Sequence, residues 1–138
     1  MDPTQDNAAR LPPGRIGRAT STVSEAQTAP RLGSGRAPVY GTPAMIALIE
    51  AAAVACVESE LAKGQETLGV HVDVEHIAAT PVGLTVTATA ELIERNGRKL
   101  LFSVVVHDER EVIGRGRHTR IIVDSARFRA KAEAKRNG

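Results

Sequence analysis

The sequence predicts an α+β domain in which an antiparallel sheet packs around one long helix. Two observations lead to this prediction. An apolar run extends from Thr42 to Val57, and after Gly64 the periodicity changes from helical to a strict alternation that continues nearly to the C-terminus. Because a helix that is apolar on every side must be buried, and a sheet with one apolar face must be covered, each element can bury the other.

The helix has clear limits in the sequence. Thr42 has the character of an N-cap and Pro43 that of a first helical residue, and Gly64 is suited to end a helix that runs to about Ala62. Glu50 is the one charge in the apolar run. A carboxylate in a buried helix is costly unless it is paired, hydrogen-bonded or protonated, so Glu50 is either a satisfied structural group or a functional one.

Four strands are predicted after the helix. Asn96-Gly97, between the second and third of them, predicts a two-residue type I′ hairpin. The chain then ends in a basic segment, Ser125–Lys135, that is predicted to be a short helix or a tail. The predicted strands are Leu68–Ala79, Gly83–Glu94, Lys99–His107 and Val112–Asp124.

The N-terminal segment, residues 1–18, is rich in Pro, Gly, Asp and Arg and lacks periodicity, so we predict that it is disordered. Residues 19–138 form a single domain in this interpretation, with a short strand around Thr20–Ser24 and a loop over Pro30–Gly41.

Composition limits the partners of the chain. Hydrophobic residues make up 42% of its 138 residues but aromatic ones only 2%, and the net charge is +2, so we expect no nucleic-acid partner. The apolar run of about 15 residues falls short of a membrane span, and we expect no membrane partner. Cys56 is the single cysteine, and no signal peptide is evident, which together favour a cytoplasmic protein.

Two polar residues are predicted to face each other across the core. His76 shares the apolar face of its strand with Val70, Val72 and Val74. That face must meet the helix that carries Glu50, or the symmetry mate of that helix in a dimer. A lone inward histidine is more often a satisfied core residue, but a Glu50–His76 pair would keep the carboxylate ionised and raise the pKa of the imidazole. Thr42 is either a simple helix cap or a hydroxyl placed at the positive end of the helix dipole.

Further positions carry weaker signals. Gly69 either begins a strand or offers a backbone N–H as an oxyanion donor, and Arg120 holds either a substrate oxygen or a structural acid.

The four histidines show no metal-ligand spacing, and no nucleotide-binding or serine-hydrolase motif is present, so we expect neither a metal nor a cofactor.

Three stretches, VYGTPAMIALIEAAAVACV, LGVHVDVEHIAATPVGLTVTATAEL and VVVHDEREVIGRGRHTRIIVD, resemble the fluoroacetyl-CoA thioesterase branch of the hotdog superfamily. The resemblance implies a hotdog fold, a curved antiparallel sheet wrapped around one long central helix, in a homodimeric enzyme. It implies the catalytic residues Thr42, Glu50 and His76, supported by Gly69 and Arg120, and a coenzyme A that is part of the substrate.

The expected function is hydrolysis of short-chain acyl-CoA thioesters. The loop before Thr42 contains Tyr40 as its only aromatic residue and lacks the phenylalanine that the fluoroacetyl-specific enzyme carries in a lid, so we expect a broader or different acyl preference. Two alternatives share the fold: a non-catalytic acyl-CoA-binding module, and a hydratase or dehydratase in which Glu50 and His76 shuttle protons without covalent chemistry.

Overall fold

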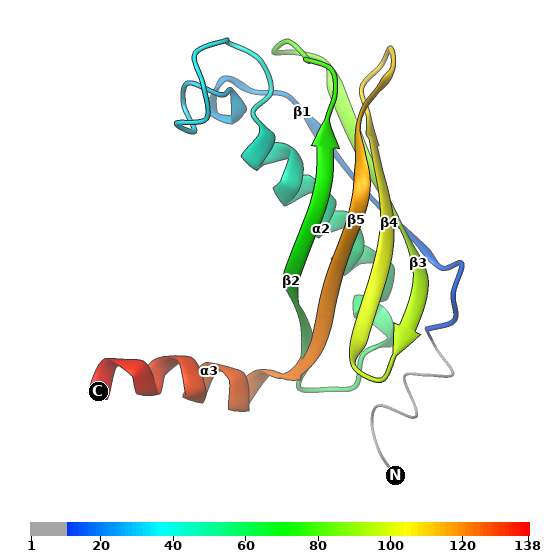
Figure 1. The fold of residues 1–138 in the computed structure, drawn as a ribbon, viewed down its shortest axis with the longest axis vertical. Coiled ribbons are helices and arrows are strands. Elements are labelled where there is room, and N and C mark those ends of the chain that lie inside the picture. The colour runs from blue at the N-terminus through cyan, green and yellow to red at the C-terminus, as the bar shows by residue number, and fades with distance from the viewer. Residues whose placement is uncertain (1–10) are drawn as a thin grey trace.

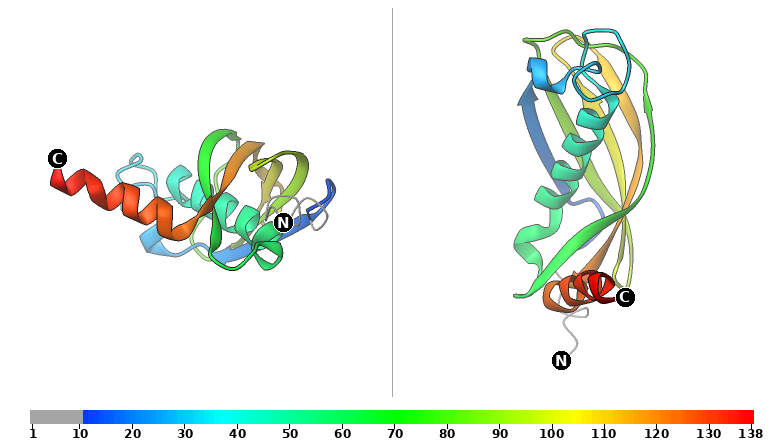
Figure 2. Two further views of the ribbon diagram at one scale, coloured as in Figure 1. Left: turned by 90° about the horizontal axis from the view of Figure 1, so that it is seen from below. Right: turned by 90° about the vertical axis from the view of Figure 1, so that its left-hand side faces the viewer.

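A five-stranded antiparallel sheet curls around a long helix in the computed structural model, which describes residues 11–138 (Figure 1). The strand order is β1-β3-β4-β5-β2, so the first and second strands along the chain form the two edges. Helix α2 lies along the concave face of the sheet, and α3 projects away from it (Figure 2). The elements are β1 (Ile16–Thr22), α2 (Thr42–Val57), β2 (Gln65–His76), β3 (Thr85–Asn96), β4 (Lys99–His107), β5 (Val112–Asp124) and α3 (Ser125–Glu133).

Helix α2 is buried on one side only. Its inner face packs on the sheet through Met45, Ile49 and Ala53, whereas Ala47 and Ala51 on the opposite face are exposed. The prediction of a helix buried all round is therefore wrong for the single chain. The small size of these alanines leaves a shallow apolar stripe that another surface can cover.

Close packing of α2 against β1 depends on a glycine. A Cβ atom at Gly17 would overlap backbone atoms of Ala52 and Cys56, so only glycine allows β1 to approach the helix this closely. The contact also fixes the preceding residues, because the Arg15 side chain donates a hydrogen bond to the Cys56 carbonyl oxygen at 2.6 Å.

The ends of α2 differ from the prediction in one respect that matters for function. The N-cap is Gly41, and Thr42 is the first helical residue, with Pro43 second. The Thr42 hydroxyl is therefore not used as a cap. After Val57 a polar 3₁₀ turn, Glu58–Glu60, extends the helical segment to 19 residues. By length and composition alone this segment would suffice to cross a membrane, but its inner face packs on the sheet.

Strand β2 contains a bulge that strict alternation does not predict. Gly69 pairs with Arg120 and His71 with Thr119, so Val70 is an extra residue with no partner in β5. Val70 is 53% exposed, where the alternation predicted it to face inward. Without the bulge, residues seven positions apart would face opposite sides of the sheet. The extra residue reverses the alternation beyond it, so Gly69 and His76 face the same side.

The N-terminal boundary and one turn also differ from the prediction. The first ten residues of the predicted disordered segment lie outside the described range, but Leu11 is buried and β1 begins at Ile16.

At the β3–β4 turn Asn96 pairs with Lys99, so the central residues are Gly97 and Arg98. Only Gly97 has a positive φ, which excludes the predicted type I′ turn.

Candidate active site

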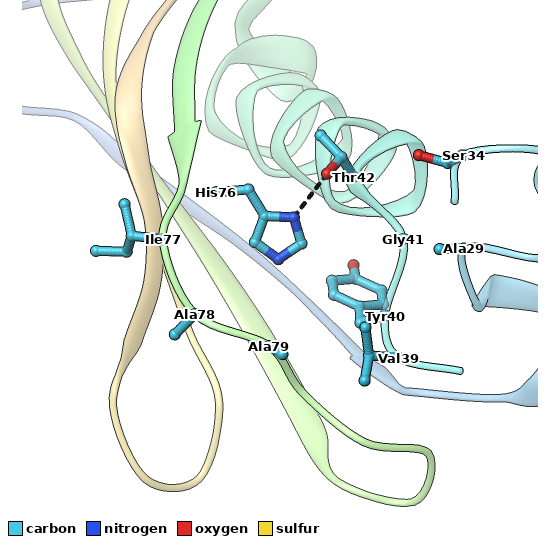
Figure 3. Close-up of a pocket in the computed structure, with 10 residues that line it drawn as sticks. All are labelled: Ala29, Ser34, Val39, Tyr40, Gly41, Thr42, His76, Ile77, Ala78 and Ala79. Atoms are coloured by element: carbon cyan, nitrogen blue, oxygen red, sulfur yellow. Dashed lines mark hydrogen bonds between the residues drawn. The ribbon is translucent and has the colours of Figure 1, made fainter. Parts of the chain in front are cut away.

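Thr42 and His76 form the first of two polar groups along α2. The Thr42 Oγ1 atom lies 2.8 Å from His76 Nδ1, at hydrogen-bonding distance, and joins the start of α2 to the end of β2 (Figure 3). The pairing arises because β2 runs along the helix and ends beside its first turn. A threonine hydroxyl held by an imidazole at the positive end of a helix is suited to polarise a carbonyl group.

A cavity of about 300 Å³ opens beside this pair, and its walls are mostly small and apolar (Figure 3). Burial lowers the pKa of His76 below its ordinary value, and the backbone of Ala78 offsets this only in part. Within the single chain the imidazole therefore lacks the raised pKa that a Glu50–His76 pair would give it. The lining residues are Ala29, Ser34, Val39, Tyr40, Gly41, Thr42, His76, Ile77, Ala78 and Ala79.

Glu50 and Arg120 form the second group, two turns further along α2. The Arg120 Nη1 atom donates to Glu50 Oε2 at 3.0 Å, while the rest of the guanidinium is held by the hydroxyl and carbonyl oxygens of Thr67 at 2.9 Å each. Arg120 is 6% exposed, whereas the Glu50 side chain is 42% exposed. The carboxylate is thus fixed by a buried arginine and still open to solvent.

His118, a residue that sequence reasoning missed, completes this group. Its Nδ1 lies 2.8 Å from the carbonyl oxygen of His71 and must donate to it, so the neutral ring presents the Nε2 lone pair to Arg120 Nη1 at 3.2 Å. Burial lowers the pKa of His118, with Arg120 acting in the same direction. The signal available in the sequence was its position two residues before Arg120 on the same face of β5.

Gly69 leaves the space that the Glu50 carboxylate occupies. A Cβ atom at this position would overlap Glu50 Oε2 and approach His118 and Arg120. Gly69 faces inward only because of the bulge at Val70. Its place is therefore explained by close approach to Glu50.

The five residues singled out from the sequence thus fall into two sets within one chain: Thr42 with His76, and Glu50 with Gly69 and Arg120. The expected Glu50–His76 pair is not formed within one chain, because among the described residues the charged partner of Glu50 is Arg120, with the His118 ring 3.9 Å from the carboxylate. Thr42 and Glu50 are eight residues apart, which is about 12 Å along a helix axis.

Comparison with known proteins identifies the family. Residues 23–126 match the family model described as FlK, fluoroacetyl-CoA-specific thioesterase. The chain belongs to this family. It is 42% identical over 97 residues to the fluoroacetyl-CoA thioesterase of Streptantibioticus cattleyicolor, a match that covers 70% of each chain.

Solved structures agree with this assignment. A structure of the fluoroacetyl-CoA thioesterase FlK superposes with a TM-score of 0.86 at 34% identity, covering 91% of this chain and 98% of that one. A Thermus thermophilus thioesterase superfamily member superposes at 0.84 with 25% identity, over 92% and 94% of the two chains. A hot-dog-like protein from Thermanaerovibrio acidaminovorans, 21% identical, matches in fold at 0.85 over 94% and 96%. The predicted hotdog fold and thioesterase family are confirmed.

Proposed function

We propose that this FlK-family protein hydrolyses short-chain acyl-CoA thioesters to the free acid and coenzyme A, using Thr42, Glu50 and His76. The observation that carries the proposal is the Glu50 carboxylate, which Arg120 fixes at 3.0 Å in the space left by Gly69, on a helix whose first turn bears the Thr42–His76 pair. A non-catalytic binding module has no need of a carboxylate held in this way.

In the proposed reaction Glu50 either attacks the thioester carbonyl carbon, forming a mixed anhydride, or activates the attacking water as a general base. Thr42 donates to the carbonyl oxygen. His76, protonated beside a Glu50 carboxylate, gives its proton to the leaving thiolate, and the water that completes the hydrolysis returns a proton to the imidazole. Arg120 keeps the carboxylate oriented. We propose that the reaction requires no cofactor besides the coenzyme A of the substrate and takes place in the cytoplasm.

We further propose that two chains assemble to bring the two sets together. The Gly69 and His76 positions are about 20 Å apart along a strand, so one chain cannot place Glu50 against His76. If the β2 edges of two chains pair antiparallel around Val72 and Asp73, the His76 end of each strand meets the Gly69 end of the other. Thr42 and His76 of one protomer would then face the partner's Glu50.

Features of the surface support this assembly. Among the described strands β2 is an edge, and it exposes Val70 and Val72. Unprotected edge strands with apolar side chains are suited to pair with another chain. A two-fold axis perpendicular to the sheet would keep both helices on the same side, where the exposed stripe of Ala47 and Ala51 can be covered.

Thiol release from a panel of acyl-CoAs tests the function directly. The panel contains acetyl-, propionyl-, butyryl- and fluoroacetyl-CoA, and we expect turnover of at least one. Absence of thiol release from all of them, with binding retained, would favour an acyl-CoA-binding module. Addition of water to crotonyl-CoA, without thiol release, would instead indicate a hydratase.

Mixing two inactive variants tests whether the site is shared between protomers. Thr42→Ala and Glu50→Gln chains, unfolded together and refolded, form heterodimers with one site that carries both substitutions and one that carries neither. At equal mixing we expect about a quarter of the wild-type activity to return, since half of the dimers are mixed and each has one intact site. If each site lay within one chain, no activity above the two parent variants would appear.

Thr42 is expected to act through its hydroxyl and not through helix stability. We predict that Thr42→Ala lowers kcat by about 100- to 1,000-fold, the range for loss of one donor to a developing oxyanion, while Thr42→Ser keeps most activity. Because Gly41 is the N-cap and Thr42 is exposed, the melting temperature should stay close to that of the wild type. A Thr42→Ala protein that melts several degrees lower with unchanged kinetics would show a purely structural role.

A further inference from the structure

Tyr40 is the one aromatic residue in the wall of the cavity beside the Thr42–His76 pair, and its hydroxyl group is unexplained by the fold. The side chain is 1% exposed, and its hydroxyl has no hydrogen-bond partner among residues 11–138. A buried hydroxyl without a partner costs about 1–3 kcal/mol. A phenylalanine would fill the same volume without this cost, so the hydroxyl requires an explanation.

A second buried polar atom in the same wall also has no partner. His76 Nε2 makes no hydrogen bond to the described residues, although Nδ1 of the same ring is bonded to Thr42. The rings of Tyr40 and His76 meet edge to face, with centroids 6.3 Å apart and planes at 78°. Figure 3 shows the Tyr40 hydroxyl directed toward the Thr42–His76 pair and not away from the cavity.

The chemistry of the two atoms selects the group that would satisfy them. Burial raises the pKa of Tyr40 to about 12, so its hydroxyl stays protonated and can donate or accept a hydrogen bond. His76 Nε2 is a donor in one tautomer and an acceptor in the other. A hydroxyl group both donates and accepts, so it can satisfy both atoms in either tautomer, whereas a carbonyl oxygen can do so only in one.

We propose that Tyr40 and His76 Nε2 bind a hydroxyl group on the acyl chain of the substrate, so that the preferred substrates are short hydroxyacyl-CoA thioesters. This inference rests on the proposed function and names its substrate class. The remaining walls suit a short chain, because Ala29, Ala78 and Ala79 leave a cavity of about 300 Å³ beside the thioester-polarising Thr42. An unsubstituted chain would cover both polar atoms with carbon and leave them unpaired.

The test compares matched substrates in wild type and Tyr40→Phe. Butyryl-CoA, 2-hydroxybutyryl-CoA and 3-hydroxybutyryl-CoA have the same carbon number, and we expect one hydroxyacyl-CoA to exceed butyryl-CoA in kcat/KM by about 10-fold or more. In Tyr40→Phe this ratio should fall to near one. Thr20→Val, which removes an exposed hydroxyl on β1, is the matched control and should keep the wild-type ratio.

Three results would overturn the proposal. A wild-type ratio near one for both hydroxyacyl-CoAs would exclude this preference. An equal loss of kcat/KM for all three substrates in Tyr40→Phe would indicate that the Tyr40 hydroxyl binds a bridging water and not the acyl chain. A Tyr40→Phe protein with a higher melting temperature and an unchanged ratio of kcat/KM values would show that the Tyr40 hydroxyl is an unpaired group with no role in binding.

The proposal can be tested apart from turnover. Non-hydrolysable analogues, in which a methylene group replaces the thioester sulfur, allow the dissociation constants of the butyryl and hydroxybutyryl compounds to be compared by calorimetry. If wild type releases no thiol but prefers a hydroxylated analogue, and Tyr40→Phe abolishes the preference, the proposed catalytic function fails while the binding inference stands. Equal affinities in this assay, for both proteins, would reject the binding inference.

Discussion

Glu50→Gln is expected to lower kcat by about 10³-fold or more, the range for removal of a positioned base or nucleophile. The substitution keeps the size of the side chain and removes its charge. Arg120 remains held by Thr67, so the surroundings of the side chain should be preserved. The change is measured as steady-state thiol release with the best short acyl-CoA, alongside a thermal melt.

The fold should tolerate this change. Glu50 is 42% exposed and its ion pair with Arg120 is partly solvated, so its loss should cost little stability. Glu50→Asp, which withdraws the carboxylate by one methylene group, should lie between wild type and Glu50→Gln in kcat. Turnover in ¹⁸O-labelled water separates the two roles, since label found in the Glu50 carboxylate identifies an anhydride intermediate. Full activity in Glu50→Gln would exclude both roles.

Much of the fold could be predicted because periodicity reports burial directly. The helix start at Thr42, the last two strands and the basic C-terminal helix were located within a few residues. What periodicity could not supply was the bulge at Val70, because a single extra residue leaves the apolar composition of β2 unchanged while reversing which residues face inward. The prediction that Val70 faces the core failed for this reason.

The candidate site was predicted as a set of residues but not as an arrangement. Glu50 stood out because it is the one charge in an apolar helix, and His76 because it interrupts an apolar face. The partners of Glu50 did not stand out in the sequence, because Arg120 and His118 lie on β5, about 70 residues away along the chain. Likewise, nothing in the sequence showed that Gly41 would cap the helix and leave the Thr42 hydroxyl free for His76.

His76→Ala is expected to lower kcat by about 10²- to 10⁴-fold, the range for loss of a general acid–base group. The substitution removes the hydrogen-bond partner of Thr42 and the source of the proton for the leaving thiolate. His76→Gln is the control, because its amide can still bond Thr42 but cannot transfer a proton at neutral pH. His76→Gln should therefore retain the melting temperature without restoring kcat, and near-normal kcat in His76→Ala would refute the role.

The titration of His76 also reports whether the two sets of residues meet across a dimer. In the single chain burial lowers the pKa of His76 from its ordinary value of 6.5. If the partner's Glu50 lies beside the imidazole, its negative charge favours the protonated ring and raises this pKa again. Glu50→Gln should then lower the pKa of His76 measured by NMR, while Glu91→Gln, a control at an exposed position of β3 away from the β2 edge, should leave it unchanged. An identical pKa of His76 in wild type and Glu50→Gln would show that the imidazole and the partner's Glu50 carboxylate lie apart in solution. That result would contradict the shared site.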